Sequence, residues 1–340
     1  MDSLVDDVSA VETLRRHANH PSAYLALNRD TSRFRVSGVD GLIAYRCAGR
    51  RHVVIAAGIT AASENRALLL DHFLSWARAR RRKVIAVQML REDAELLAQR
   101  GFRVNQIGGS YSVGLGEFKI AGTAFIKLRN KISRARRAGV EVMELGNDLP
   151  TSPELAQSIR GIDDEWIRGK HAKELEFLVG EVGDLTSMDY VTERTKRIFV
   201  AMTDGAPVAY VLYVASFGAS RGWMHDLSRR LSQAPTGTME LINITAIERF
   251  KAERAEMLNF GFTPLTALDR EHEIPGAWSR MAAWIFKQLA LRGSFIYPAQ
   301  TQLAYKMKWA PSLVQPEYVA FQGGFTLGGL WQFLRLTKAI

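Results

Sequence analysis

The sequence predicts an α/β protein built of two similar halves, each a mixed, mostly antiparallel sheet flanked by helices. Short apolar runs broken by Gly-containing turns, which are typical of antiparallel strands, alternate with longer segments that repeat apolar residues at helical spacing. The same order of elements recurs later in the chain, although no residue-level repeat accompanies it. We therefore expect the 340-residue chain to consist of two halves, 1–120 and 121–340.

The first half is predicted to form one compact unit. Ser63 is the expected N-cap of its long helix, and Gly101 closes its short helix. After a packing helix at 9–17, the expected elements are strands at 42–47 and 52–57, a helix at 63–83, a strand at 84–89, a helix at 91–101 and a strand pair within 102–115.

The second half is predicted to repeat this order with longer strands. The dipeptide Asp204-Gly205 lies between two apolar runs and is typical of a tight hairpin turn. The expected elements are a basic helix at 121–139, a strand at 140–145, a helix at 153–168, strands at 197–203, 206–216 and 222–228, a helix at 238–253, a strand at 256–262 and a helix at 276–292. The stretch 325–340 is expected to be a helix whose apolar face either packs on the core or lies in a membrane interface.

Composition limits both the partners and the chemistry. The formal net charge is +10, with basic clusters at 78–83 and 127–137 that suit RNA or an anionic lipid surface, a solvated helix face being the ordinary alternative. Cys47 is the only cysteine, which excludes internal disulfides and multi-cysteine metal sites, and the seven histidines are scattered. No apolar run reaches the roughly 18 to 20 residues that cross a bilayer, and no signal-peptide pattern is present. We expect a soluble cytoplasmic protein without a bound metal.

Several motifs occur in one order along residues 34–325. They are "IKLRNKISRARRAGVEV" (126–142), "DDEWIRGKHAKELEF" (163–177), "DLSR" (226–229), "APTGTME" (234–240), "LNFGFTPL" (258–265) and "LAYKMKWAPSLVQPEYVAFQGG" (303–324). Together they resemble the C-terminal domain of the phosphatidylglycerol lysyltransferases and alanyltransferases. The resemblance implies a tandem GNAT-like fold and an enzyme that transfers an amino acid from aminoacyl-tRNA to an acceptor, with no acetyl-CoA and no other cofactor.

The chain departs from that family at positions that bear on the acceptor. It carries Thr236 where the lipid enzymes have Asn, "YPAQTQ" at 297–302, Leu175-Glu176 in place of Lys-Gly, and no counterpart of their multi-helix membrane domain. The acceptor is therefore either a phospholipid such as phosphatidylglycerol, which we favour, or a small hydroxylamine, amine or alcohol of a natural-product pathway. A non-catalytic tRNA-binding module and an ordinary acyl-CoA acetyltransferase are the remaining alternatives.

The expected catalytic residues follow from the chemistry of an already activated ester. Such an ester requires an aligned acceptor, removal of its proton and stabilisation of a tetrahedral oxyanion. Asp226 would hold the substrate ammonium group or orient the nucleophile, and Arg229 would bind a phosphate, unless the two pair with each other. Glu240 is either a pocket carboxylate or an acid in the first turn of a helix, where it interacts favourably with the helix dipole.

Two further groups of residues complete the expected site. Thr236 and Gly237 place backbone N–H groups at a helix start, and Lys306 and Lys308 would share one face if their segment were extended. The expected substrate-binding residues are Glu174, Thr236, Gly237, Asn259, Lys306 and Lys308. The expected tRNA-binding residues are Lys127, Arg129, Lys131, Arg134, Arg136 and Arg137. The amino acid carried, the general base, any peripheral contact with the inner face of the membrane and the oligomeric state stay open.

Overall fold

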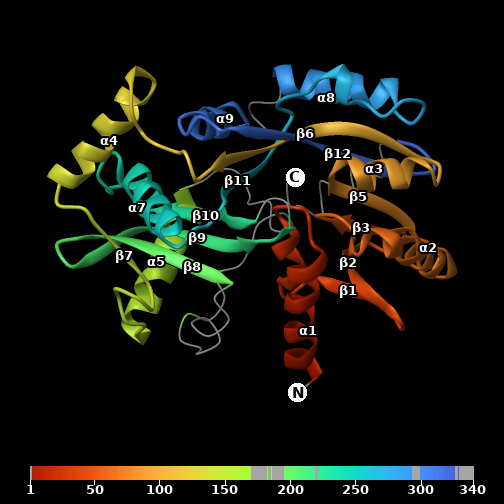
Figure 1. Ribbon diagram of the computed structural model, residues 1–340, viewed down its shortest axis with the longest axis horizontal. Helices are drawn as coiled ribbons and strands as arrows, with labels where there is room; N and C mark the ends of the chain where they lie inside the picture. The colour runs from red at the N-terminus through yellow and green to blue at the C-terminus, as the bar shows by residue number, and fades with distance from the viewer. Residues whose placement is uncertain are drawn as a thin grey trace.

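The structure is a computed structural model that describes residues 2–169, 195–218, 221–292 and 299–325, with the single positions 182, 185 and 328 (Figure 1). Its helices within these ranges are α1 (Asp2–His17), α2 (Ser63–Ala79), α3 (Arg91–Ala98), α4 (Ile126–Arg137), α5 (Pro153–Gly169), α7 (Thr238–Ala252), α8 (Arg280–Arg292) and α9 (Ala299–Met307). Short 3-10 helices include η1 (Ala23–Leu27), η2 (Thr123–Phe125) and η5 (Arg270–His272). No helix in these ranges is long and apolar enough to span a membrane.

The described strands form one 12-stranded sheet, in the order β1-β2-β3-β5-β12-β6-β11-β10-β9-β8-β7 with β4 beside β2. The strands are β1 (Ser32–Val36), β2 (Val39–Ala48), β3 (His52–Ala56), β4 (Thr60–Ala61), β5 (Lys83–Met89), β6 (Phe102–Gly114), β7 (Glu141–Glu144), β8 (Lys196–Thr203), β9 (Ala206–Ser216), β10 (Gly222–Arg230), β11 (Met257–Pro264) and β12 (Leu313–Gln322). The pairs β3/β5 and β10/β11 are parallel, each joined through a helix, and the other pairs are antiparallel. The expected α/β fold class, with a mixed and mostly antiparallel sheet flanked by helices, is confirmed.

Both faces of the sheet are covered by helices. Because successive residues of a strand point to opposite faces, Val53 and Ile55 pack with α2 and α3, whereas Val54 and Ala56 pack with α8. In the second half, α4 and α7 cover one face and α5 covers the other. Figure 1 shows α8 on the outside of the molecule, beyond β6 and β12.

The C-terminal strand β12 belongs to the sheet of the first half. It lies between β5 and β6 and pairs antiparallel with both. The sheet also continues across residue 120, because β6 pairs with β11. The division of the chain at residue 120 stays a prediction.

Some elements differ from the sequence expectation. The segment 102–115 holds the single strand β6 and no hairpin, since Gly108 and Gly109 stay in the strand, and a Cβ at Gly108 would lie 2.3 Å from the carbonyl oxygen of Thr263. The basic helix begins at Ile126, after η2. The N-cap of α2 is Ala62, so Ser63 is the first residue of the helix and not its cap.

In the second half, one expected turn is confirmed, one expected helix begins later, and one stretch is not described. The hairpin turn at Asp204-Gly205 is confirmed, with φ angles of 51° and 77°. The helix expected from 276 begins at Arg280. The stretch 325–340 lies outside the described residues, except positions 325 and 328.

Candidate active site

The candidate site is a pocket between two parallel strands that diverge. Strands β10 and β11 pair only at 222–224 with 257–259, and beyond these residues they separate. A cavity of about 540 Å³ opens where the pairing ends. Its lining residues are Ser22, Gln88, Lys131, Trp166, Met224, His225, Asp226, Ser228, Arg230, Pro235, Thr236, Gly237, Thr238, Met239, Glu240, Phe260, Gly261, Phe262, Pro264, Thr301, Gln302, Tyr305 and Lys306.

Irregularities in both strands widen the gap and turn side chains into it. The pairing of β10 with β9 shifts register between His225 and Leu227, so Asp226 is the extra residue of a β-bulge. As a result the consecutive residues His225 and Asp226 both line the pocket. The pairing of β11 with β6 shifts between Asn259 and Phe262 in the same way.

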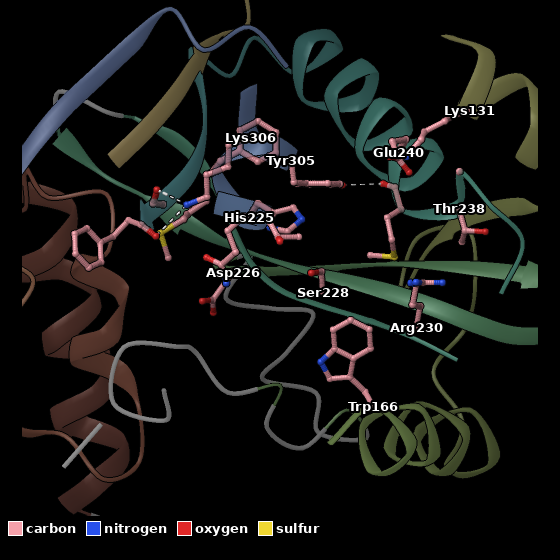
Figure 2. Close-up of a pocket in the computed structure, with 18 of the residues that line it drawn as sticks. Lys131, Trp166, His225, Asp226, Ser228, Arg230, Thr238, Glu240, Tyr305 and Lys306 are labelled. Atoms are coloured by element: carbon pink, nitrogen blue, oxygen red, sulfur yellow. Dashed lines mark hydrogen bonds and ion pairs between the residues drawn. The ribbon is translucent and has the colours of Figure 1, made fainter. Parts of the chain in front are cut away.

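His225 and Asp226 lie with Lys306 at one end of the pocket (Figure 2). Burial lowers the pKa of His225 to about 4, with a smaller effect in the same direction from the charge of Lys306. The imidazole is therefore neutral near pH 7, and its Nε2 has no hydrogen-bond partner among the described residues. A neutral imidazole beside a carboxylate gives this wall a hydrogen-bonding group and an anionic group.

Lys306 contributes a buried amine to the same end. It belongs to the helix α9, so the condition under which Lys306 and Lys308 would share one face, an extended segment, is not met. The Nζ donates to the carbonyl oxygens of Gly261 at 2.7 Å and Phe262 at 3.0 Å, where β11 leaves its regular register. Burial lowers the pKa of Lys306 to about 7, although the charge of Glu317 acts against this shift. Lys306 thus binds backbone groups that the irregularity leaves available.

Glu240 lies at the opposite end with Lys131 (Figure 2). It is buried in the first turn of α7, and its Oε1 accepts from Lys131 Nζ at 3.1 Å and Lys308 Nζ at 3.2 Å. Burial acts to raise the pKa of Glu240, but the two lysines outweigh burial and keep it below its ordinary value. Glu240 is therefore a carboxylate that holds two cations, Lys131 in the pocket lining and Lys308 outside it.

Gly237 brings the basic helix next to the pocket. It precedes α7 with a φ of 96°, and a Cβ at this position would lie 2.0 Å from the carbonyl oxygen of Lys131 in α4. Only glycine permits this approach without a backbone shift. Thr236 and Gly237 both line the pocket, while the Thr238 hydroxyl donates to the carbonyl oxygen of Pro235 at 2.7 Å.

Four of the expected catalytic and substrate-binding residues are not among those that line the cavity. One of them, Lys308, reaches the site only through its contact with Glu240. Arg229 is a buried residue of β10, and its Nε lies 3.3 Å from Asp163 Oδ1. Its side chain therefore contacts a carboxylate outside the cavity, in place of the expected phosphate. Asn259 is fully buried and accepts from Ser112 Oγ at 2.6 Å, which braces the last paired position of β11. Glu174 lies outside the described residues.

The six cations expected to bind tRNA divide into two groups. Lys127, Arg134, Arg136 and Arg137 are exposed on α4, whose buried residues Leu128, Ile132 and Ala135 pack on the core. Arg129 instead donates to the carbonyl oxygens of Ile120 and Gly122, and Lys131 pairs with Glu240.

Comparison with known proteins bears on this geometry. The family model described as "Phosphatidylglycerol lysyltransferase, C-terminal" matches residues 11–321. The chain belongs to this family. The match extends over most of both halves and includes every described residue of the pocket.

This chain is similar to part of the length of two named proteins. A phosphatidylglycerol lysyltransferase of Bacillus subtilis is 25% identical over 260 residues, 76% of this chain and 29% of the relative. The lysylphosphatidylglycerol biosynthesis bifunctional protein LysX of Mycolicibacterium gilvum is 24% identical over 229 residues, 67% of this chain and 20% of the relative. The chain thus spans a quarter or so of the length of these relatives.

Two solved structures share the fold of this chain. The C-terminal domain of a protein described as a lysylphosphatidylglycerol synthetase from Agrobacterium fabrum gives a TM-score of 0.76 at 21% identity, covering 99% of this chain and 96% of that chain. The structure of L-PGS from Bacillus licheniformis gives a TM-score of 0.73 at 23% identity, covering 98% of this chain and 95% of that chain.

Some lining residues were not singled out from the sequence. His225 and Trp166 stood inside the quoted motifs or beside them, but only the bulge and the position of α5 bring them to the pocket. Tyr305 accepts from Asn243 Nδ2 at 2.8 Å and so attaches α9 to α7. No group of three or more His, Cys, Asp or Glu within the described ranges could hold a metal ion, and the absence of a cofactor stays a prediction.

Proposed function

We propose that the protein transfers an aminoacyl group from aminoacyl-tRNA to a phospholipid such as phosphatidylglycerol. The observation that carries the proposal is the pocket between β10 and β11, with Asp226 and Lys131 of the cationic helix α4 in its lining, in a chain of this family. The relatives are named for transfer of lysine to phosphatidylglycerol. The amino acid that this chain carries is left to experiment.

In the proposed reaction, a hydroxyl of the lipid headgroup attacks the ester carbonyl of the aminoacyl-tRNA. A new ester bond forms, the old one breaks, and the proton of the acceptor hydroxyl ends on the ribose oxygen of the terminal adenosine. Asp226 accepts or orients that proton, since a positioned carboxylate in a pocket suits general-base catalysis. The N-terminus of α7, where Gly237 and Thr238 line the pocket, favours the developing oxyanion.

The donor is proposed to approach along α4. Four cations of this helix are exposed, and Gly237 permits the close approach of the helix to the Glu240 end of the pocket. Lys131 and Lys308 carry positive charge at that end, where both pair with Glu240. This arrangement suits a phosphate backbone that ends in a small ester group.

The test is transfer of radiolabel from a mixture of charged tRNAs, incubated with the protein and phosphatidylglycerol vesicles, or with a soluble cell extract. Label in the lipid fraction supports the proposal, and repetition with single tRNAs identifies the amino acid. Label in a small soluble product would instead favour the small-molecule acceptor. Label that stays on tRNA in both reactions would overturn the proposed transfer activity.

A further inference from the structure

Helix α8 exposes large apolar side chains to solvent. Met281, Trp284 and Leu291 are 53%, 64% and 71% exposed, which are high values for side chains of this size. They lie within about 80° of one another around the axis, since successive residues of an α-helix are about 100° apart. The opposite side of the helix is used for packing, because Ala282 and Phe286 are buried against the sheet. The helix therefore has one face in the core and a second apolar face outside it.

Positive charge borders the exposed apolar face. Arg280 and Lys287 are exposed, at angles about 20° to 60° beyond Trp284 and Leu291. Neither side chain makes an ion pair or hydrogen bond within the described residues. The sequence of α8 contains no acidic residue. An apolar face edged by cations matches a surface that is apolar inside and anionic outside, as an anionic lipid leaflet is.

The position of α8 relates this face to the pocket. The next helix in the chain is α9, which lines the pocket with Gln302, Tyr305 and Lys306. Figure 1 shows α8 and α9 along the same outer edge of the molecule. The cationic helix α4, proposed to receive tRNA, is a separate element at the Glu240 end of the pocket.

We propose that α8 docks the protein on an anionic lipid surface through Met281, Trp284 and Leu291, with Arg280 and Lys287 at the level of the headgroups. Trp and Met insert among the upper acyl chains, and the cations pair with lipid phosphates. This docking serves the lipid-acceptor function proposed above and rests on it for its purpose. Binding to the surface can be measured without any transfer.

The test is co-sedimentation of the full chain with vesicles of phosphatidylcholine alone or mixed with phosphatidylglycerol. Wild type is expected to bind the mixed vesicles, and Trp284→Ser with Leu291→Ser to bind them more weakly by on the order of tenfold or more. Lys287→Glu is expected to weaken binding roughly tenfold on mixed vesicles only. The matched control is Leu68→Ser with Ile167→Ser, two residues that are 47% and 55% exposed on α2 and α5.

Equal binding by wild type and the Trp284/Leu291 variant would overturn the docking proposal. The proposal would also be overturned if the wild-type protein were a dimer that the same substitutions dissociate. A loss of tRNA affinity in the Trp284/Leu291 variant would overturn it as well. A second assay, transfer to soluble glycerophosphoglycerol, distinguishes failure of the docking proposal from failure of the proposed function. The variant should lose transfer to vesicles and retain transfer to the soluble headgroup, whereas absence of transfer by wild type to either acceptor would contradict only the proposed function.

Discussion

At the scale of the residue, the pocket depends on one extra position in β10. His225 and Asp226 are neighbours in the chain, and a regular strand would point them to opposite faces. The bulge at Asp226 places both in the pocket. The sequence identified Asp226 through its motif but offered no means to recognise the bulge, because register depends on pairing with a separate strand. His225 was therefore missed, and Arg229, three residues after Asp226, was expected in the pocket.

The low pKa of His225 makes stability depend on pH. Burial lowers that pKa from 6.5 to about 4. As the pH falls from 6.5 to about 4, the unfolded chain takes up a proton that the folded chain does not, so stability decreases over this interval. Thermal unfolding of His225→Gln should show a shallower loss of the melting temperature between these pH values than wild type.

The control for this measurement is His72→Gln, at an exposed histidine of α2, which should keep the wild-type profile. Parallel profiles for wild type and His225→Gln would mean that His225 titrates alike in the folded and unfolded chain.

At the scale of the element, α4 has two distinct sides. Its inner residues pack on the core, its start bonds the preceding loop through Arg129, and its outer side carries four exposed cations. The sequence predicted the basic helix, because charge and periodicity are local properties. It did not separate the structural cations from the exposed ones, since the partners Gly122 and Glu240 are assigned only by the fold.

Removal of exposed cations should weaken tRNA binding. Arg134→Ala with Arg137→Ala is expected to lower the affinity and to reduce the slope of log K against log salt by about two, one for each lost phosphate contact. Filter binding over a range of salt concentrations measures both quantities. The comparison variant is Arg78→Ala with Arg81→Ala in the other basic cluster. An equal loss from both pairs would mean that α4 has no special part in tRNA binding.

The contact between α4 and α7 should be sensitive to a single methyl group. Gly237→Ala places a Cβ against the carbonyl oxygen of Lys131, whereas Gly139→Ala, at a φ of 72°, meets no atom within 4 Å. Both changes cost about 1 to 2 kcal/mol from the left-handed backbone, and Gly237→Ala should cost about 1 to 3 kcal/mol more. Urea unfolding measures the two free energies, and equal values would show that the close approach can be relieved without cost.

At the scale of the whole molecule, a strand from late in the chain lies within the part of the sheet that the first half builds. Most strands and helices were predictable, because alternation and helical spacing are visible in short windows. The insertion of β12 between β5 and β6 was not, because about 200 residues lie between β6 and β12 and no local pattern encodes that pairing. The same limit applies to α9, whose helical form and place in the pocket wall were not predicted.

The central claim is that aminoacyl transfer takes place in the pocket between β10 and β11. The most direct measurement is single-turnover transfer from charged tRNA to phosphatidylglycerol vesicles by wild type, Asp226→Asn and the exposed control Asp164→Asn. Asp226→Asn should lower the rate by about 10² to 10⁴-fold, with tRNA affinity and melting temperature unchanged, while Asp164→Asn behaves as wild type. Transfer by Asp226→Asn at the wild-type rate would contradict the claim.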